Sequence, residues 1–394
     1  MEKYSSKIIN LPGYVITNHH ADRYRVNFRV SVESKEDICP KCSQKTTTVY
    51  ETKERLIKHC FWAERRCNLF VNQRRFKCQQ CKHRFWEVPP GTLKYGRRTE
   101  NFKKQIARTA LHGHDNKRVS KDFCVGQATV KRDIDHHTKL EVKKKLSKKC
   151  PRVLGVDEHY FTKKKGFATT FCNLGKHEVF DVVLGRSDLA LEGFLRRLPD
   201  KDRCKVVVMD LSGSYRSIIR KHFPHAKIVT DRFHVVRLLN QRFSETWKLL
   251  DEVGRKNIGL ISLFRRKPEN LSPSQKINLK KYLESKPGLL AAYDFRNEIH
   301  ELLIRKNISK SKMRQSIKEF ARTIEYLEES RFKPLMSLAQ TFKDWQEEIL
   351  RMLRFSRSNG ITEGFHNKME VISRRAYGFR NFQNYRRRVL LQCA

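Results

Sequence analysis

The sequence has few acidic residues and no long hydrophobic run. Asp and Glu number 42 against 84 Lys and Arg, which gives the 394-residue chain a formal net charge of +42. No apolar run approaches the roughly 18 residues that a transmembrane helix needs. The first residues, MEKYSSKIINLPGY, lack the apolar core of a signal peptide. These absences predict a protein of the cytoplasm or bacterial nucleoid with no membrane partner.

The excess of positive charge indicates a polyanionic partner. A small-molecule enzyme has no need of a net charge of +42. Nucleic acid is the first candidate, because phosphates attract clustered Lys and Arg. A basic surface kept only for solubility is the alternative.

The chain has 11 cysteines, and a reducing compartment favours thiols that bind metal or lie buried over disulfides. Four of them form two Cys-x-x-Cys pairs, Cys39 with Cys42 and Cys78 with Cys81. Each pair can turn both thiolates toward one metal, so residues 1–90 are predicted to form a Cys₄ zinc ribbon. The zinc is expected to be structural because no coordination position is left open. Four nearby residues are expected in the core or at the surface: His59, Cys60, Cys67 and His83.

Residues 91–150 are predicted to be a helical DNA-binding domain and linker. Thr99 is a plausible N-cap, and Phe102, Ile106 and Ala110 recur on one helical stripe. The segment RVSKDFCVGQATVKRDIDHHTKLE then predicts a helix–turn–helix. Ser120 would cap its short first helix, Gly126 would lie in the turn, and residues 127–137 would form the second helix.

The second helix of this motif would face a major groove of DNA. Five of its residues are placed to do so: Gln127, Thr129, Lys131, Arg132 and Asp133. An ordinary basic helical hairpin is the alternative, since the motif is degenerate. The basic segment EVKKKLSKKCPR that follows is expected to be an exposed helix tail or a linker, or to contact phosphates.

Residues 151–231 have an α/β pattern. Apolar, β-branched runs predict three strands, a helix, a strand, a helix and a final strand. Two strands lead into acids, Val153–Val156 into Asp157 and Val206–Val208 into Asp210. This order is that of the RNase H-like fold, which has one acid on its first strand and one at the end of its fourth. We therefore expect an α/β catalytic domain of that class.

The rest of the chain is helical. Residues 232–354 are long, charged and periodic, and are expected to be an all-helical insertion into the catalytic domain. Residues 355–394 would complete that domain. There Ser358 and Asn359 precede a helix that carries Glu363. Basic residues follow, and three are expected to contact DNA: Arg374, Arg375 and Arg380.

Three carboxylates, those of Asp157, Asp210 and Glu363, are the candidate catalytic site. Magnesium prefers a few carboxylates together with water and phosphate oxygens. Three carboxylates can hold two Mg²⁺ or Mn²⁺ ions that clamp the attacking and leaving oxygens of a phosphoryl displacement. Taken alone, Glu363 would be an ordinary first-turn acid that stabilises the helix dipole.

Several stretches resemble one known family over nearly the whole chain. LGVDE, VVMDLSGSY, DRFHVVRLLN and, above all, SNGITEGFHNKMEVISRRAYGFRNFQNYRRRVLL are similar to the DDE transposases of the ISL-three insertion sequences. The resemblance implies that Asp157, Asp210 and Glu363 bind the catalytic metal. It also implies cleavage of double-stranded DNA at terminal inverted repeats, transfer of the 3′ hydroxyl into target DNA, and a homodimer or higher oligomer on DNA.

Two rival functions remain open at this stage. One is a non-catalytic DNA-binding regulator derived from a transposase, and the other is a nuclease or resolvase with the same fold. Asp231 and His234 also have two readings: they belong to the metal site or contact DNA, or Asp231 caps the first insertion helix and His234 packs beside it.

Overall fold

The computed structural model describes residues 10–62, 64–113, 115–145, 149–266, 268–355 and 360–393. The chain divides into two compact units. The first contains residues 1–147 and 372–391, and the second contains residues 148–371 and 392–394. The division falls within helix α14 (Gly360–Arg375) and is coarser than the five segments predicted from the sequence.

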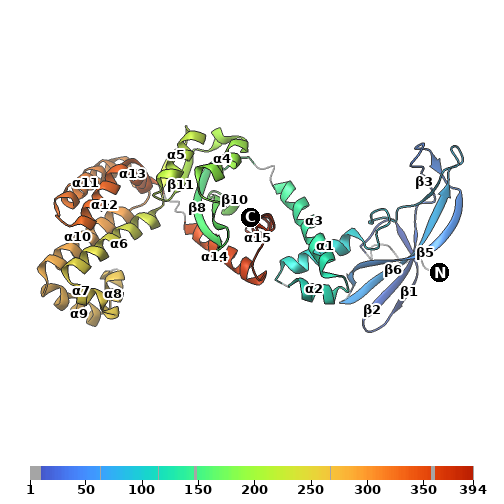
Figure 1. Ribbon diagram of the computed structural model, residues 1–394, viewed down its shortest axis with the longest axis horizontal. Helices are drawn as coiled ribbons and strands as arrows, with labels where there is room; N and C mark the ends of the chain where they lie inside the picture. The colour runs from blue at the N-terminus through green and yellow to red at the C-terminus, as the bar shows by residue number, and fades with distance from the viewer. Residues whose placement is uncertain are drawn as a thin grey trace. The chain divides into compact units, whose positions relative to one another are not determined.

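A twisted sheet forms the N-terminal part of the first unit (Figure 1). Its strands have the order β1-β2-β6-β5, and the short β7 also pairs with β6. Alternate side chains of β2 are buried, because Val26, Phe28 and Val30 share the face that packs on the core. The strands, including the two-stranded ribbon β3-β4, are β1 (Tyr14–Ala21), β2 (Arg25–Val32), β3 (Asp37–Ile38), β4 (Lys45–Thr46), β5 (Val49–Trp62), β6 (Arg65–Lys77) and β7 (Arg84–Trp86).

Three helices follow in the same unit: α1 (Glu100–Leu111), α2 (Asn116–Asp122) and α3 (Gln127–Lys145). The predicted cap of α1 is confirmed, since the Thr99 hydroxyl accepts a hydrogen bond from the Phe102 backbone N–H. The stripe of Phe102, Ile106 and Ala110 is buried against α2 and α3. Helix α15 (Phe382–Gln392) joins this unit, where Arg387 forms an ion pair with Asp135 of α3.

Two local predictions for α2 and α3 were wrong. Asp115, not Ser120, caps α2 by accepting from the Arg118 backbone N–H at 2.9 Å. Ser120 lies inside α2, and its hydroxyl donates to the Val125 carbonyl at 2.6 Å. Helix α3 continues past residue 137 to Lys145, because Thr138 and Val142 are buried along the continuing helix.

The second unit is built on a mixed five-stranded sheet of order β10-β9-β8-β11-β12. Strands β8, β9 and β10 pair antiparallel, whereas β8, β11 and β12 are parallel. The predicted succession of elements is confirmed: β8 (Val153–Thr162), β9 (Gly166–Asn173), β10 (Glu178–Leu184), α4 (Asp188–Arg197), β11 (Val206–Met209), α5 (Gly213–His222) and β12 (Lys227–Thr230). All of β11 is buried, as expected of a strand between two others.

The described part of the 232–354 segment contains only helices, as predicted. They are α6 (Arg232–Leu250), α7 (Glu252–Lys256), α8 (Ile258–Arg265), the 3₁₀ turn Pro268–Asn270, α9 (Pro273–Glu284), α10 (Pro287–Ile304), α11 (Lys310–Glu329), α12 (Lys333–Asp344) and α13 (Gln346–Arg354). Pro273 and Pro287 each occupy the first position of a helix, where proline is tolerated because it needs no backbone donor there. Among the described helices, none has the length and apolarity to cross a membrane.

Candidate functional site

Two of the predicted acids lie at the same point of the sheet in the second unit. Gly155 of β8 pairs with Val208 of the parallel strand β11. Asp157 and Asp210 each follow two residues later, so the register brings them side by side. Ligand atoms of Asp157, Asp210 and His234 all lie within 4.8 Å of one another. The sequence therefore predicted two of these three neighbours as site residues.

His234 reaches the site from the first turn of α6. Its Nε2 lies 3.1 Å from Asp210 Oδ1 and 3.8 Å from Asp231 Oδ2. Asp231 caps α6 by accepting from the Phe233 backbone N–H. Each of the two alternatives left open by the sequence is therefore partly correct. Asp231 caps α6, and this helix brings His234 to the acids.

The Asp210 carboxylate fits a bound cation. Its Oδ1 is buried and accepts no hydrogen bond from the described residues, because the approach of the His234 nitrogen lacks hydrogen-bond geometry. A buried carboxylate oxygen without a donor is costly, and a metal ion would satisfy it. The oxygen-rich donor set of two aspartates suits a hard divalent ion such as Mg²⁺.

The charges of the cluster also favour a bound cation. Burial, opposed by the Glu158 backbone N–H and assisted by the charges of Asp231, Glu158 and Glu363, raises the pKa of Asp157 to about 7. Burial and the charge of Asp157 raise the pKa of Asp210 to about 8. Both carboxylates would ionise more readily beside a divalent cation.

Glu363 lies in the first turn of α14 and its side chain is exposed. Its carboxylate is outside the three-residue cluster, yet its charge contributes to the raised pKa of Asp157. One turn later, His366 Nδ1 lies 3.9 Å from Asp157 Oδ2, and its Nε2 is 3.2 Å from the Thr170 hydroxyl. The start of α14 therefore faces Asp157. Ser358 and Asn359, predicted to precede this helix, lie outside the described residues.

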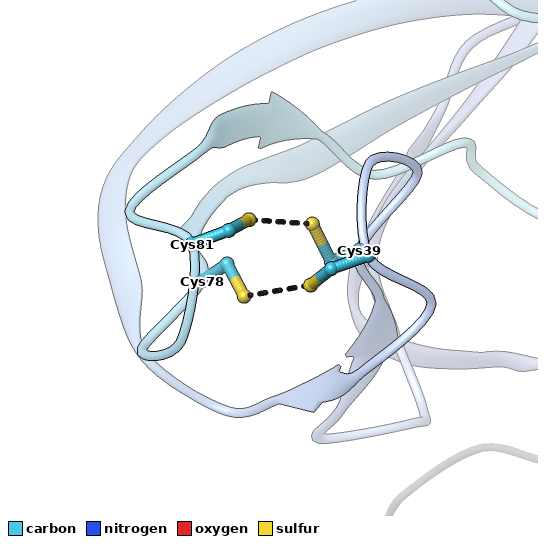
Figure 2. Close-up of side chains that lie close together, drawn as sticks. Cys39, Cys78 and Cys81 are labelled. Atoms are coloured by element: carbon cyan, nitrogen blue, oxygen red, sulfur yellow. Dashed lines mark hydrogen bonds between the residues drawn. The ribbon is translucent and has the colours of Figure 1, made fainter.

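The four predicted zinc ligands come together in the first unit. Cys39 Sγ is 3.6 Å from Cys81 Sγ, and Cys42 Sγ is 3.5 Å from Cys78 Sγ. Figure 2 shows the two loops facing each other with all four sulfur atoms turned inward. The strands β5 and β6 span the long gap between the pairs.

Hydrogen bonds at these loops favour the thiolate form that zinc requires. A hydrogen bond from the Cys81 backbone N–H is the largest of the causes that lower the pKa of Cys78 to about 6. A hydrogen bond from the Gln44 backbone N–H lowers the pKa of Cys42, but burial and the neighbouring thiolates outweigh it and raise that pKa to about 12. Four sulfur atoms within 4.8 Å of one another fit a site that a cation would complete.

Comparison with known proteins identifies the family of the chain. The profile of a family described as a transposase, of the ISL3 type, matches residues 154–389. The chain belongs to the ISL-three transposase family. A second profile, described as the zinc-finger of the transposases IS204, IS1001, IS1096 and IS1165, matches residues 35–81 of this transposase. The resemblance seen in the sequence is therefore confirmed.

Two curated proteins are similar to this transposase. The transposase for insertion sequence element IS1001 of Bordetella parapertussis is 28% identical over 354 residues, which cover 87% of this chain and 86% of that protein. An ATP-dependent protease of Lactococcus lactis subsp. lactis is 36% identical over 56 residues, which cover 14% of this chain and 18% of that protein.

The residues of the transposase predicted to contact DNA are mostly accessible. Gln127, Lys131 and Arg132 are exposed on α3, and Thr129 is half-buried and accepts a hydrogen bond from Arg132. The prediction for Asp133 was wrong, because Asp133 is buried and paired with Arg98. In the C-terminal part, the three arginines predicted to contact DNA are exposed: Arg374, Arg375 and Arg380.

Two histidines near the acids were not among the predicted site residues. His159 of β8 and His366 of α14 have ring centroids 5.0 Å apart, and the His159 Nδ1 is 2.9 Å from the Thr170 hydroxyl. Burial and the neighbouring His366 lower the pKa of His159 to about 3, and burial lowers that of His366 to about 4. Both rings are therefore neutral at pH 7. The position of His159 two residues after Asp157, on the same strand face, was the available signal.

Proposed function

We propose that this transposase catalyses divalent-metal-dependent cleavage of DNA strands at the ends of an insertion sequence and transfers the resulting 3′ hydroxyl into target DNA. The observation that carries the proposal is the clustering of Asp157, Asp210 and His234 within 4.8 Å, with Asp210 Oδ1 buried and without a hydrogen-bond donor. Such a site needs a cation, and a net charge of +42 suits a DNA substrate.

In this proposal Asp157 and Asp210 hold Mg²⁺ or Mn²⁺ at the sheet, and Glu363 supplies the third carboxylate. When bound, the ions would polarise the scissile phosphate and activate water or a hydroxyl. His234 Nε2, 3.1 Å from Asp210 Oδ1, would join the two aspartates as a further ligand. His366 and Thr170 orient the face of Asp157 that looks toward α14.

We further infer that the second unit is RNase H-like and that the first unit recognises DNA. The strand order β10-β9-β8-β11-β12, with only β8, β11 and β12 parallel, supports the first inference. The short helix α2 and the exposed basic face of α3 support a helix–turn–helix. The four clustered cysteines support a structural Zn²⁺. A homodimer or higher oligomer on the element ends remains part of the proposal.

A non-catalytic DNA-binding regulator is the alternative. The observation that favours it is the exposed Glu363 carboxylate, which stands outside the cluster formed by Asp157, Asp210 and His234. In a regulator, Glu363 would serve only as a first-turn acid at the N-terminus of α14.

A cleavage assay on DNA that spans the terminal inverted repeat and its flank separates the two functions. The purified protein should produce a strand with a new 3′ hydroxyl when Mg²⁺ or Mn²⁺ is present, and none in EDTA. Tight binding to this DNA without cleavage in either metal would overturn the proposed catalysis and leave the regulator.

A further inference from the structure

A groove runs along helix α6 beside the acids, within the second unit. Its volume is about 620 Å³, within the range of roughly 300–1,000 Å³ typical of ligand sites. On α6 its lining extends from Phe233 to Trp247, a span of about 21 Å at 1.5 Å per residue. Residues of α7, α8 and α10 complete the walls. Six of the lining residues carry the argument below: Phe233, Arg237, Trp247, Arg255, Arg265 and Arg296.

The groove carries a surplus of positive charge. Four arginines line it, and Glu245 is its single acid. That acid already accepts hydrogen bonds from Arg242 Nη1 at 2.9 Å and Gln241 Nε2 at 3.0 Å. The four lining arginines therefore give the groove a net positive charge that favours an anionic ligand.

Arg296 is the most informative of these arginines, because it is only 7% exposed. Its Nε and Nη2 donate to Asn240 Oδ1 at 2.9 and 2.5 Å, and its Nη1 donates to Asn297 Oδ1 at 2.7 Å. Both acceptors are neutral amides, and no carboxylate pairs with Arg296 in the part of the chain that the structure describes. A buried guanidinium without an anion is costly, and two of its five N–H groups remain to bind one.

Aromatic side chains lie along the same groove. Trp247 and Phe264 stack with ring centroids 4.0 Å apart and form its inner wall. Phe233 lies at the opposite end of the α6 lining and is 51% exposed. A half-exposed ring between arginines suits the stacking of an unpaired base.

The Phe233 end of the groove adjoins the acids. Phe233 and Arg237 flank His234 on α6, and the His234 Nε2 is 3.1 Å from Asp210. The Arg237 charge also acts on Asp210, since it opposes the rise in that carboxylate's pKa. A DNA strand whose phosphate lies at Asp157 and Asp210 would thus reach the groove within about one helical turn.

We propose that this groove binds an unpaired segment of the DNA strand that continues from the phosphate at the acids. Phe233 stacks on a base near the acids, while Arg237, Arg265 and Arg296 bind the phosphates that follow. The inference rests on the proposed function and extends it. It requires that the DNA substrate be locally single-stranded when the strand is cleaved. Duplex DNA would then be read by the first unit, and unpaired nucleotides by the helical insertion.

Binding of two probes to the full chain in EDTA tests this inference without any cleavage. The probes are a fluorescein-labelled oligothymidylate of about 12 nucleotides and a blunt duplex of the same length. Phe233→Ala and Arg237→Gln change exposed groove residues and should leave the fold intact. Each should weaken binding of the oligothymidylate about ten-fold and leave duplex binding little changed.

Two matched variants on α11 serve as controls. Tyr326→Ala removes an exposed aromatic ring and Arg314→Gln removes an exposed charge, both away from the groove lining. Neither should change binding of the oligothymidylate. Equal losses on both probes, or an unchanged affinity for the oligothymidylate in the groove variants, would overturn the inference. A failure of the proposed catalysis is read separately, as absence of cleavage by the wild-type protein in Mg²⁺.

Discussion

Arg216 of α5 clamps the carboxylate of Glu348 on α13, with Nε to Oε1 and Nη2 to Oε2 both at 2.9 Å. Glu348 is fully buried, and Arg220 approaches the same carboxylate at 3.2 Å. Arg216 also donates to the Asp344 carbonyl at 2.8 Å. The last helix of the 232–354 segment is thereby fixed to α5, which follows β11 of the sheet in the second unit.

Removal of this clamp is expected to destabilise the second unit. Glu348→Gln would leave Arg216 and Arg220 facing a buried neutral amide, and should lower the free energy of unfolding by about 3–5 kcal/mol. Urea denaturation measures the change. Glu347→Gln is the matched control, because Glu347 is 69% exposed in its pair with Arg351 and should cost about 0.5 kcal/mol or less. Similar losses from both variants would contradict the role of the clamp.

Replacement of any of the three carboxylates should abolish strand cleavage. Asp157→Asn, Asp210→Asn and Glu363→Gln should each reduce the cleavage rate at least about a thousandfold, because each removes a charge that holds the metal. Gel shift should show DNA binding close to that of the wild type. Glu370→Gln, a change at an exposed acid on the same helix as Glu363, should cleave normally. A Glu363→Gln protein that retains normal cleavage would remove Glu363 from the site.

The raised pKa values of Asp157 and Asp210 predict a stability penalty in the absence of metal. A folded-state pKa of about 8 for Asp210, against 3.8 for the free group, means that the folded protein holds this proton more tightly. In EDTA, the free energy of unfolding should therefore fall as pH rises from about 4 to about 8. Above pH 8, Asp210→Asn should raise stability by roughly 2 kcal/mol or more, with little effect near pH 4.

Thermal melts of the wild type and of Asp210→Asn, near pH 4 and above pH 8, measure this effect. Saturating Mg²⁺ should stabilise the wild type and not the Asp210→Asn variant. Asp294→Asn, at an exposed acid of α10, provides a control that should melt like the wild type at both pH values. A melting temperature of Asp210→Asn that equals that of the wild type at high pH would refute the penalty.

Loss of one ribbon cysteine should release the zinc. Cys78→Ser removes a thiolate ligand, so metal analysis should find far less than the one zinc per chain expected of the wild type. Binding to duplex DNA should weaken with it. Cys124→Ser changes an exposed cysteine outside the cluster and should keep the metal. Zinc content that survives Cys78→Ser would exclude the proposed centre.

Local patterns were sufficient to predict much of the structure. The strands of the second unit follow from apolar runs, and Asp157 and Asp210 follow from where those runs end. The cap of α2 was misassigned because Asp115 and Ser120 are both favoured N-cap types, and only the packing of Val119 and Phe123 fixes where this short helix begins.

Other features depend on partners far away in the sequence. Asp133 is buried because Arg98 pairs with it from before α1, which no helical periodicity could indicate. The approach of His234 to Asp210 follows from how α6 leaves β12. The groove beside α6 likewise forms only where four helices of the insertion pack together, so no single segment of the sequence could predict it.

The first unit contains residues 1–147 together with residues 372–391, where Arg387 pairs with Asp135. During synthesis, the ribosome must therefore deliver residues 148–371 of the second unit before the first can gain α15. The first unit is begun before the second, but it is completed only after nearly all of the second has been made. A polypeptide interrupted before Ile372 would leave the α3 surface around Asp135 uncovered, and this order ties completion of the first unit to synthesis of the second.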